Sequence, residues 1–121
     1  MTSRSFFSRA LLGLAALTAL VVATTDVASA QSTQVGTVYR LHVRASDGMI
    51  YFYLTGPRSV QPSCATQPYW MLANETTAAA KQQLALLMMA EATGKSVTVF
   101  GTGTCSRWPD GESVLEIAVA D

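Results

Sequence analysis

The chain has 121 residues, and its eight basic and eight acidic side chains give a formal net charge of zero. A neutral chain builds no strong positive field, so nucleic acid and anionic membrane surfaces are disfavoured as partners. This length leaves room for one folded domain and no second one.

The first thirty residues have the pattern of a secretory signal peptide. Arg4 and Arg9 provide a positive start, and residues 10–23 are almost all apolar or small. Ala28-Ser29-Ala30 fits the cleavage rule and predicts a cut before Gln31. The apolar run of about 14 residues is short of the roughly 20 that span a bilayer. A retained membrane anchor is the less favoured alternative.

We therefore expect residues 1–30 to be a signal peptide and residues 31–121 to form one exported domain, periplasmic or secreted. Removal of Arg4, Arg9 and Asp26 leaves six basic and seven acidic residues, a net charge of about −1. A nearly neutral exported domain suggests a protein, a sugar or a small molecule as its partner.

Two cysteines, Cys64 and Cys105, lie in the exported part. In an exported chain this number predicts one disulfide, here closing a loop of about 42 residues. The alternative is a catalytic or metal-binding thiol. His42 is the single histidine and no CxxC motif is present, so we expect neither a metal nor a cofactor.

The first half of this domain is typical of β-structure. Residues 31–34 are expected to be a disordered leader, followed by an alternating strand over 35–44. Its odd-numbered residues, from Val35 to Val43, would share one face, and Arg40, His42 and Arg44 the other. Ser46-Asp47-Gly48 predicts a hairpin turn. A returning strand over 49–55 would point Ile50, Phe52 and Leu54 into the core and Tyr51 and Tyr53 away from it.

The second half adds one helix and three further strands. A proline-rich loop over 56–68 precedes a short strand over 69–73. The helix is expected over 77–93, because this segment is rich in Ala, Leu, Met and Gln and Gly94 follows it. Strands over 96–100 and 114–119 complete the chain. The expected apolar stripe of the helix is Ala80, Leu84, Leu87, Met88 and Glu91, widened by Leu86, Met89 and Ala90.

This order of elements predicts a mainly β fold with one helix between the third and fourth strands. It matches a small five-stranded OB-fold-like barrel carrying one disulfide. A helix packed on an open antiparallel sheet is the other arrangement that these elements allow.

Several of these residues also suggest a family. The run Ala92-Thr93-Gly94-Lys95-Ser96-Val97-Thr98-Val99 follows the helix, Cys64 precedes Trp70, and Gly103-Thr104-Cys105 closes the pattern. From Gly36 to Ile117 the chain resembles small secreted proteins related to the B subunit of subtilase cytotoxin. The resemblance implies an OB-fold and a pentameric ring with its helices at the centre. It also implies binding of sialylated glycans on cell surfaces.

The candidate binding residues are aromatic and cationic. Tyr51 and Tyr53 lie opposite the core residues of their strand, and Arg40 and His42 are expected on the neighbouring strand. Such a group can hold a sugar or a carboxylate by stacking and hydrogen bonding. Trp108, in a loop beside Cys105, is a second candidate platform. The competing interpretation is that the tyrosines only cover the barrel or face another subunit.

Catalytic residues are not predicted. His42 is interpreted as a packed or surface histidine rather than a general base. Asp110, Glu112 and Glu116 are close in sequence, and Glu112 and Glu116 could lie on the same side of a strand. These two are interpreted as surface carboxylates that favour solubility, and a glycosidase pair is the less favoured alternative. The helix is apolar over a wider arc than one core face needs, which favours self-association through Leu86 and Met89. A deeply buried helix in a monomer is the alternative.

We therefore expect a non-enzymatic exported binding module that recognises a glycan or another cell-surface ligand. The alternative is a stand-alone periplasmic or secreted protein that binds a protein, as an inhibitor or an envelope factor.

Overall fold

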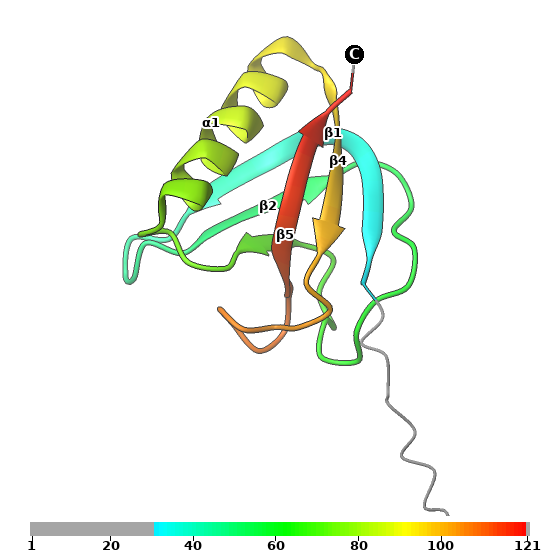
Figure 1. The fold of residues 1–121 in the computed structure, drawn as a ribbon, viewed down its shortest axis with the longest axis vertical. Coiled ribbons are helices and arrows are strands. Elements are labelled where there is room, and N and C mark those ends of the chain that lie inside the picture. The colour runs from blue at the N-terminus through cyan, green and yellow to red at the C-terminus, as the bar shows by residue number, and fades with distance from the viewer. Residues whose placement is uncertain (1–30, 121) are drawn as a thin grey trace, which may run out of the picture.

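The computed structural model describes residues 31–120 (Figure 1). The predicted signal peptide, residues 1–30, lies outside the described residues.

The described chain contains five strands and one helix. They are β1 (Thr33–Val43), β2 (Ile50–Leu54), β3 (Trp70–Leu72), α1 (Ala78–Thr93), β4 (Ser96–Gly101) and β5 (Glu112–Val119). The mainly β composition and the place of the helix between β3 and β4 are therefore confirmed. The disordered leader is not, because β1 already begins at Thr33 and both Ser32 and Gln34 are buried.

The five strands form a closed barrel in the order β1-β2-β3-β5-β4. Closure depends on the length of β1. Its first half, Thr33–Thr37, pairs with β4, and its second half, Val38–Val43, pairs with β2. The short β3 joins β5 in the one parallel pairing, whereas the other four strand pairs are antiparallel. Helix α1 lies against β1 and β5, across one side of the barrel (Figure 1).

A β-bulge divides the two halves of β1. The pairing with β2 shifts register between Val38 and Arg40. A bulge adds one residue to one strand and so changes which face the following side chains take. Gln34 and Val38 are buried before the bulge, whereas Leu41 packs on the core after it. The strict alternation predicted for this strand is therefore wrong beyond Val38.

The core fills the barrel and the space beneath α1. Phe52, Trp70 and Val99 are fully buried, and α1 contributes Ala80, Leu87 and Ala90. These three helix positions follow a spacing of seven and three residues, which places them on one helix face. The predicted stripe was wrong at Met88, whose side chain is 57% exposed, and at Glu91, which is exposed. No helix among residues 31–120 is long and apolar enough to cross a membrane.

The ends of α1 are set by residues that the sequence also marks. The Thr77 side chain accepts a hydrogen bond from the Ala80 backbone N–H, which satisfies one free donor of the first turn. At the other end Gly94 has a φ of 67° and donates its N–H to the Ala90 carbonyl. This left-handed conformation is accessible to glycine at little cost, so the helix stops there.

The predicted disulfide is present between Cys64 and Cys105, with Cα atoms 6.1 Å apart. It ties the loop between β2 and β3 to the loop between β4 and β5. The sequence separation is 41 residues. A cross-link of this span removes much of the conformational freedom of the unfolded chain.

We expect the double variant Cys64→Ser/Cys105→Ser to lose about 4 kcal/mol of unfolding free energy, the chain-entropy value for this loop. Urea denaturation of the oxidised wild type and the variant measures the difference. A loss below about 1 kcal/mol would show that the bond does not limit the unfolded chain in this way.

Candidate functional site

The outer surface of β1 and β2 carries stacked aromatic rings. His42 lies directly across from Tyr51 in the strand pairing, and their rings stack with centroids 4.7 Å apart and an interplanar angle of 8°. The Tyr53 ring meets both in edge-on contacts, 6.1 Å from His42 and 6.4 Å from Tyr51. All three side chains are half-buried. The structure therefore brings together three of the predicted binding residues.

The β-bulge adds Tyr39 and Arg40 to this group. Alternation would place these neighbours on opposite faces, yet both lie beside Tyr53. The Tyr39 ring is 5.8 Å from the Tyr53 ring, and the Arg40 guanidinium carbon is 5.7 Å from it. Tyr39 is 50% exposed and Arg40 is exposed. Sequence analysis missed Tyr39 because the pattern gives no sign of the bulge.

We call this surface, formed by Tyr39, Arg40, His42, Tyr51 and Tyr53, the aromatic face. It rests on a small apolar cluster of Met49, Tyr69 and Met71, which is separate from the barrel core. Tyr69 donates a hydrogen bond from its hydroxyl to the Asp110 carboxylate. Burial, together with this bond, raises the pKa of the Tyr69 phenol well above its usual range. The phenol therefore stays a proton donor, and the layer under the aromatic face is fixed.

Two loops meet beside the aromatic face. Arg44 binds the Asp47 carboxylate through Nε at 2.8 Å and Nη2 at 2.6 Å within the β1–β2 turn. From the β4–β5 loop, Arg107 reaches the Asp47 carboxylate at 3.2 Å and the Glu75 carboxylate at 2.9 Å. Glu75 also accepts the Ile50 backbone N–H. This chain of charges links both loops to the segment before α1.

Arg44 and Asp47 hold each other in their ionised forms. Hydrogen bonds from Arg44 hold the pKa of the Asp47 carboxyl well below its usual range. The same pairing raises the pKa of the Arg44 guanidinium. Because a lowered carboxyl pKa stabilises the folded state above the unfolded pKa, this contribution is lost as the pH falls through the folded value.

The Trp108 ring contacts the side chain of Arg44, in the β1–β2 turn. The Arg44 guanidinium carbon lies 4.0 Å from the centre of the Trp108 ring, and the Trp108 side chain is 41% exposed. A cation over an indole face is a favourable contact. The contact holds the exposed Trp108 ring against Arg44, where the β1–β2 and β4–β5 loops meet.

This arrangement suits ligand binding. Arg40 has no salt bridge among the described residues, whereas Arg44 and Arg107 are paired with carboxylates. The aromatic face thus combines an uncommitted cationic donor with rings that can stack on a ligand. His42 faces rings rather than a carboxylate or a nucleophile. Residues 31–120 contain no group of three His, Cys, Asp or Glu that could hold a metal ion.

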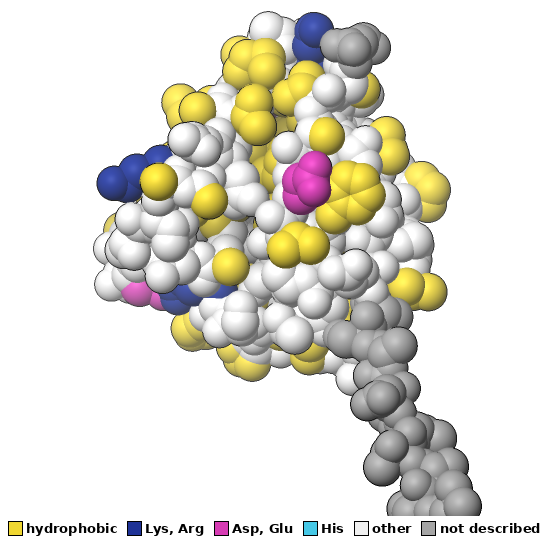
Figure 2. Space-filling model, viewed as in Figure 1, with side chains coloured by type: hydrophobic (Ala, Val, Ile, Leu, Met, Phe, Trp, Pro, Cys, Tyr) yellow, Lys and Arg dark blue, Asp and Glu magenta, His cyan; other side chains and the backbone are white. Residues whose placement is uncertain are grey.

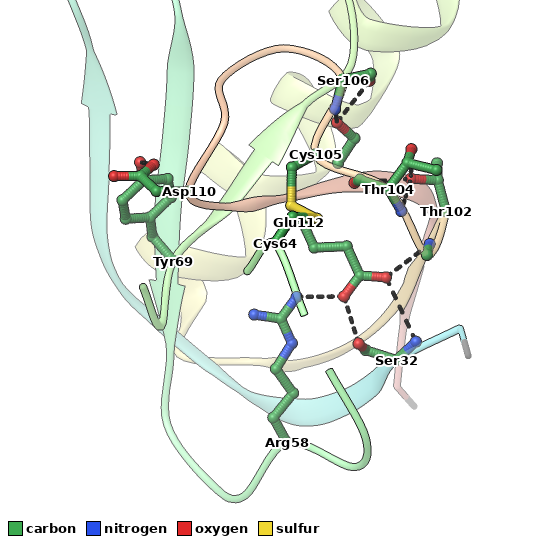
Figure 3. The surroundings of a disulfide bond; sticks show 12 residues. Ser32, Arg58, Cys64, Tyr69, Thr102, Thr104, Cys105, Ser106, Asp110 and Glu112 are labelled. Carbon is green, nitrogen blue, oxygen red and sulfur yellow. Dashed lines mark hydrogen bonds and ion pairs between the residues drawn. A yellow bond between two sulfur atoms is a disulfide. The ribbon is translucent and has the colours of Figure 1, made fainter. Parts of the chain in front are cut away.

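The prediction that Glu112 is a surface carboxylate is wrong. Glu112 is fully buried at the start of β5. Its oxygens accept hydrogen bonds from the Ser32 hydroxyl, the Gly103 N–H at 2.8 Å and Arg58 Nη2 at 2.6 Å (Figure 3). Its carboxylate also leaves no room for a side chain at Gly101. Glu112 therefore connects the start of β1, the β2–β3 loop and the β4–β5 loop.

The neighbouring carboxylates Asp110 and Glu116 differ from each other in their surroundings. Asp110 holds Tyr69, so it is also structural, whereas Glu116 is exposed on β5 as predicted. The three acids lie within seven residues of one another in the sequence, and their spacing does not show which of them is buried. Only the partners that the tertiary fold supplies distinguish the buried one.

The predicted interface residues lie on the outer side of α1. Met89 is 39% exposed and Leu86 is half-buried. Met88, Phe100 and Leu115 are further exposed apolar side chains on α1, β4 and β5. Figure 2 shows hydrophobic side chains gathered over this side of the molecule, around an acidic group. The described surface thus has apolar area that the barrel core does not use.

Replacement of the buried carboxylate should be costly. We expect Glu112→Gln to lower the unfolding free energy by about 3–5 kcal/mol, because Arg58 keeps a buried charge without its counter-ion. The matched control is Glu116→Gln, an exposed position on the same strand, where a change within about 0.5 kcal/mol is expected. Urea denaturation at neutral pH compares the two. Equal losses at both positions would contradict a structural role for Glu112.

Comparison with protein-family models, curated proteins and solved structures finds no match to this chain.

Proposed function

We propose that the chain is a non-enzymatic exported binding module whose aromatic face binds a glycan. The observation that carries the proposal is the exposed Tyr39–Arg40 pair beside Tyr53, with no carboxylate neutralising Arg40. Stacking against the apolar faces of sugar rings and hydrogen bonds from a guanidinium are the contacts that such a surface offers.

The fold supports this choice of face. We propose that the closed barrel, with its helix between β3 and β4, is an OB-like fold. Proteins of that fold bind oligosaccharides and oligonucleotides on the face of strands 2 and 3 and through the loops that follow strands 1 and 4. The aromatic face shares β2 with that surface and extends onto β1, and the Arg44–Asp47 turn and Trp108 belong to the β1–β2 and β4–β5 loops, which supports the choice of this region. The low net charge favours the saccharide over the nucleic acid.

Export agrees with the disulfide. Disulfide bonds persist mainly in oxidising compartments, and the Cys64–Cys105 bond belongs to the loop that carries Trp108. We propose that the domain works in the periplasm or outside the cell. The resemblance to B subunits of subtilase cytotoxin supports the same proposal and adds a homo-oligomer to it.

Exposed tyrosine, tryptophan and arginine side chains are also frequent at the centres of protein interfaces. A protein ligand on the same face is therefore the second candidate. Both candidates predict that the aromatic face is essential, and the type of ligand captured separates them.

We expect Tyr53→Ala to weaken glycan binding about three- to tenfold, because an aromatic contact of this kind contributes about 0.5–1.5 kcal/mol. A glycan array with the oxidised domain identifies the ligand, and titration calorimetry with that ligand measures the loss. The control is Phe100→Ala, which removes an exposed ring from β4, away from the aromatic face. An array without signal, together with Tyr53-dependent capture of a cell-envelope protein, would replace the glycan by a protein.

Substitutions on the outer side of α1 test the proposed homo-oligomer separately from ligand binding. If the outer side of the helix is an interface, Leu86→Glu and Met89→Glu should reduce the mass in solution from that of an oligomer to that of a monomer. Both substitutions leave the buried helix residues Leu87 and Ala90 in place. Light scattering after size exclusion measures the mass. A wild-type protein that is already a monomer would remove the ring from the proposal.

A further inference from the structure

The outer side of α1 is an apolar helix face without a partner inside the domain. Ala80, Leu87 and Ala90 pack on the barrel core, whereas Met88 and Met89 are 57% and 39% exposed. In Figure 1 no other element of residues 31–120 covers this side of the helix. Neighbouring exposed apolar side chains of this kind mark a surface for interaction.

The exposed residues of α1 follow one line along the helix. The line consists of Ala78, Lys81, Ala85, Met88 and Ala92, all of them exposed. Their alternating steps of three and four residues place them on one face, and this is the spacing with which one helix packs against another. The alanines allow a second helix to approach closely, and Met88 supplies a side chain that can fill the space between the two helices.

The helix contains two charged residues, and they lie near its opposite ends. Lys81 is at the end of the first turn, and Glu91 is in the last turn, about 15 Å away along the helix axis. Both side chains are exposed. Within residues 31–120 neither side chain forms a salt bridge or a hydrogen bond. Both charges are therefore available to a partner molecule.

Each of these charges is at the end of α1 where the helix dipole disfavours it. A helix N-terminus favours acidic side chains, and a C-terminus favours basic ones. In α1 the first turn contains no acid and the last turn contains no base. A second, antiparallel copy of the helix would reverse both effects. Lys81 would then face a C-terminus and a glutamate, whereas Glu91 would face an N-terminus and a lysine.

We propose that two copies of this chain associate through α1, with their helices antiparallel about a twofold axis. Lys81 of each copy pairs with Glu91 of the other copy. Ala85 and Met88 lie midway between the two charges, so Met88 of each copy packs on Ala85 of the other copy near the axis. This inference rests on the homo-oligomer proposed above and specifies its form.

The charges of α1 favour this dimer over a ring. Around a fivefold axis neighbouring helices run in the same direction, which brings Lys81 beside Lys81 and Glu91 beside Glu91. In the antiparallel pair every contact between charges is attractive, and a twofold contact contains each ion pair twice. One helix face is a small interface, so we expect a reversible dimer rather than a permanent one.

Charge reversal tests the antiparallel arrangement. Lys81→Glu and Glu91→Lys each convert two attractive pairs into two repulsive ones, so each should raise the Kd of the dimer about tenfold. The double variant Lys81→Glu/Glu91→Lys restores both pairs with exchanged signs and should dimerise like the wild type. Sedimentation equilibrium of the oxidised domain over a series of concentrations measures the mass and the Kd.

Two controls accompany these variants. Arg40→Glu makes the same change of charge as Lys81→Glu at an exposed position on the aromatic face, and it should leave the Kd within about twofold of the wild-type value. Urea denaturation of each variant at low concentration checks the fold of the monomer. Each single reversal on α1 places a charge where the helix dipole favours it, so the monomer should remain folded.

A dimer whose Kd is unchanged by the single reversals, or not restored by the double variant, would overturn the antiparallel arrangement. A mass of five subunits would overturn it too, but would leave the proposed homo-oligomer in place. A wild-type domain that remains a monomer up to about 1 mM would overturn both. Glycan binding is unaffected by these results, because Tyr53 and its neighbours do not belong to α1.

Discussion

The buried carboxylate of Glu112 is the interaction on which the rest of this structure depends. It sits at the first residue of β5 and binds Ser32 before β1, Arg58 in the β2–β3 loop and Gly103 in the β4–β5 loop. A barrel of this size buries a limited apolar core, so such a connection between distant segments matters. The cost of burying the carboxylate is offset only because all these donors converge on it.

The disulfide and Glu112 both connect the β2–β3 loop to the β4–β5 loop, but they stabilise the fold in different ways. Cys64–Cys105 restricts the unfolded chain, whereas the carboxylate network orders the folded one. Together they fix the β4–β5 loop, from which Arg107 and Trp108 reach the β1–β2 turn. The exposed aromatic residues are thus held on a rigid support. Binding to a rigid surface costs less conformational entropy than binding to a mobile one.

Arg40 and Arg58 differ in their surroundings. Arg40 is exposed and lies over tyrosine rings, so it can meet a ligand that stacks on the surface. Arg58 is buried against Trp70 and paired with Glu112, so it belongs to the network that holds the loops together.

Local sequence determined most of the secondary structure of this protein. Thr77 and Gly94 mark the ends of α1, the Ser46-Asp47-Gly48 turn pairs β1 with β2, and Ile50, Phe52 and Leu54 alternate into the core as predicted. The disulfide followed from the number of cysteines and the expectation of export. These features depend on residues close together in the chain, or on a pairing with one possibility, and so the sequence alone determines them.

Tertiary structure decided the rest. The bulge after Val38 brought Tyr39 to the aromatic face, and no local pattern marks it. Glu112 and Glu116 look alike in the sequence, yet only Glu112 meets Ser32, Arg58 and Gly103, which lie 80, 54 and 9 residues away. The environment of a charged side chain is set by the partners that folding brings to it. The sequence therefore determined the elements and the disulfide, whereas packing decided which charges are buried and which rings gather.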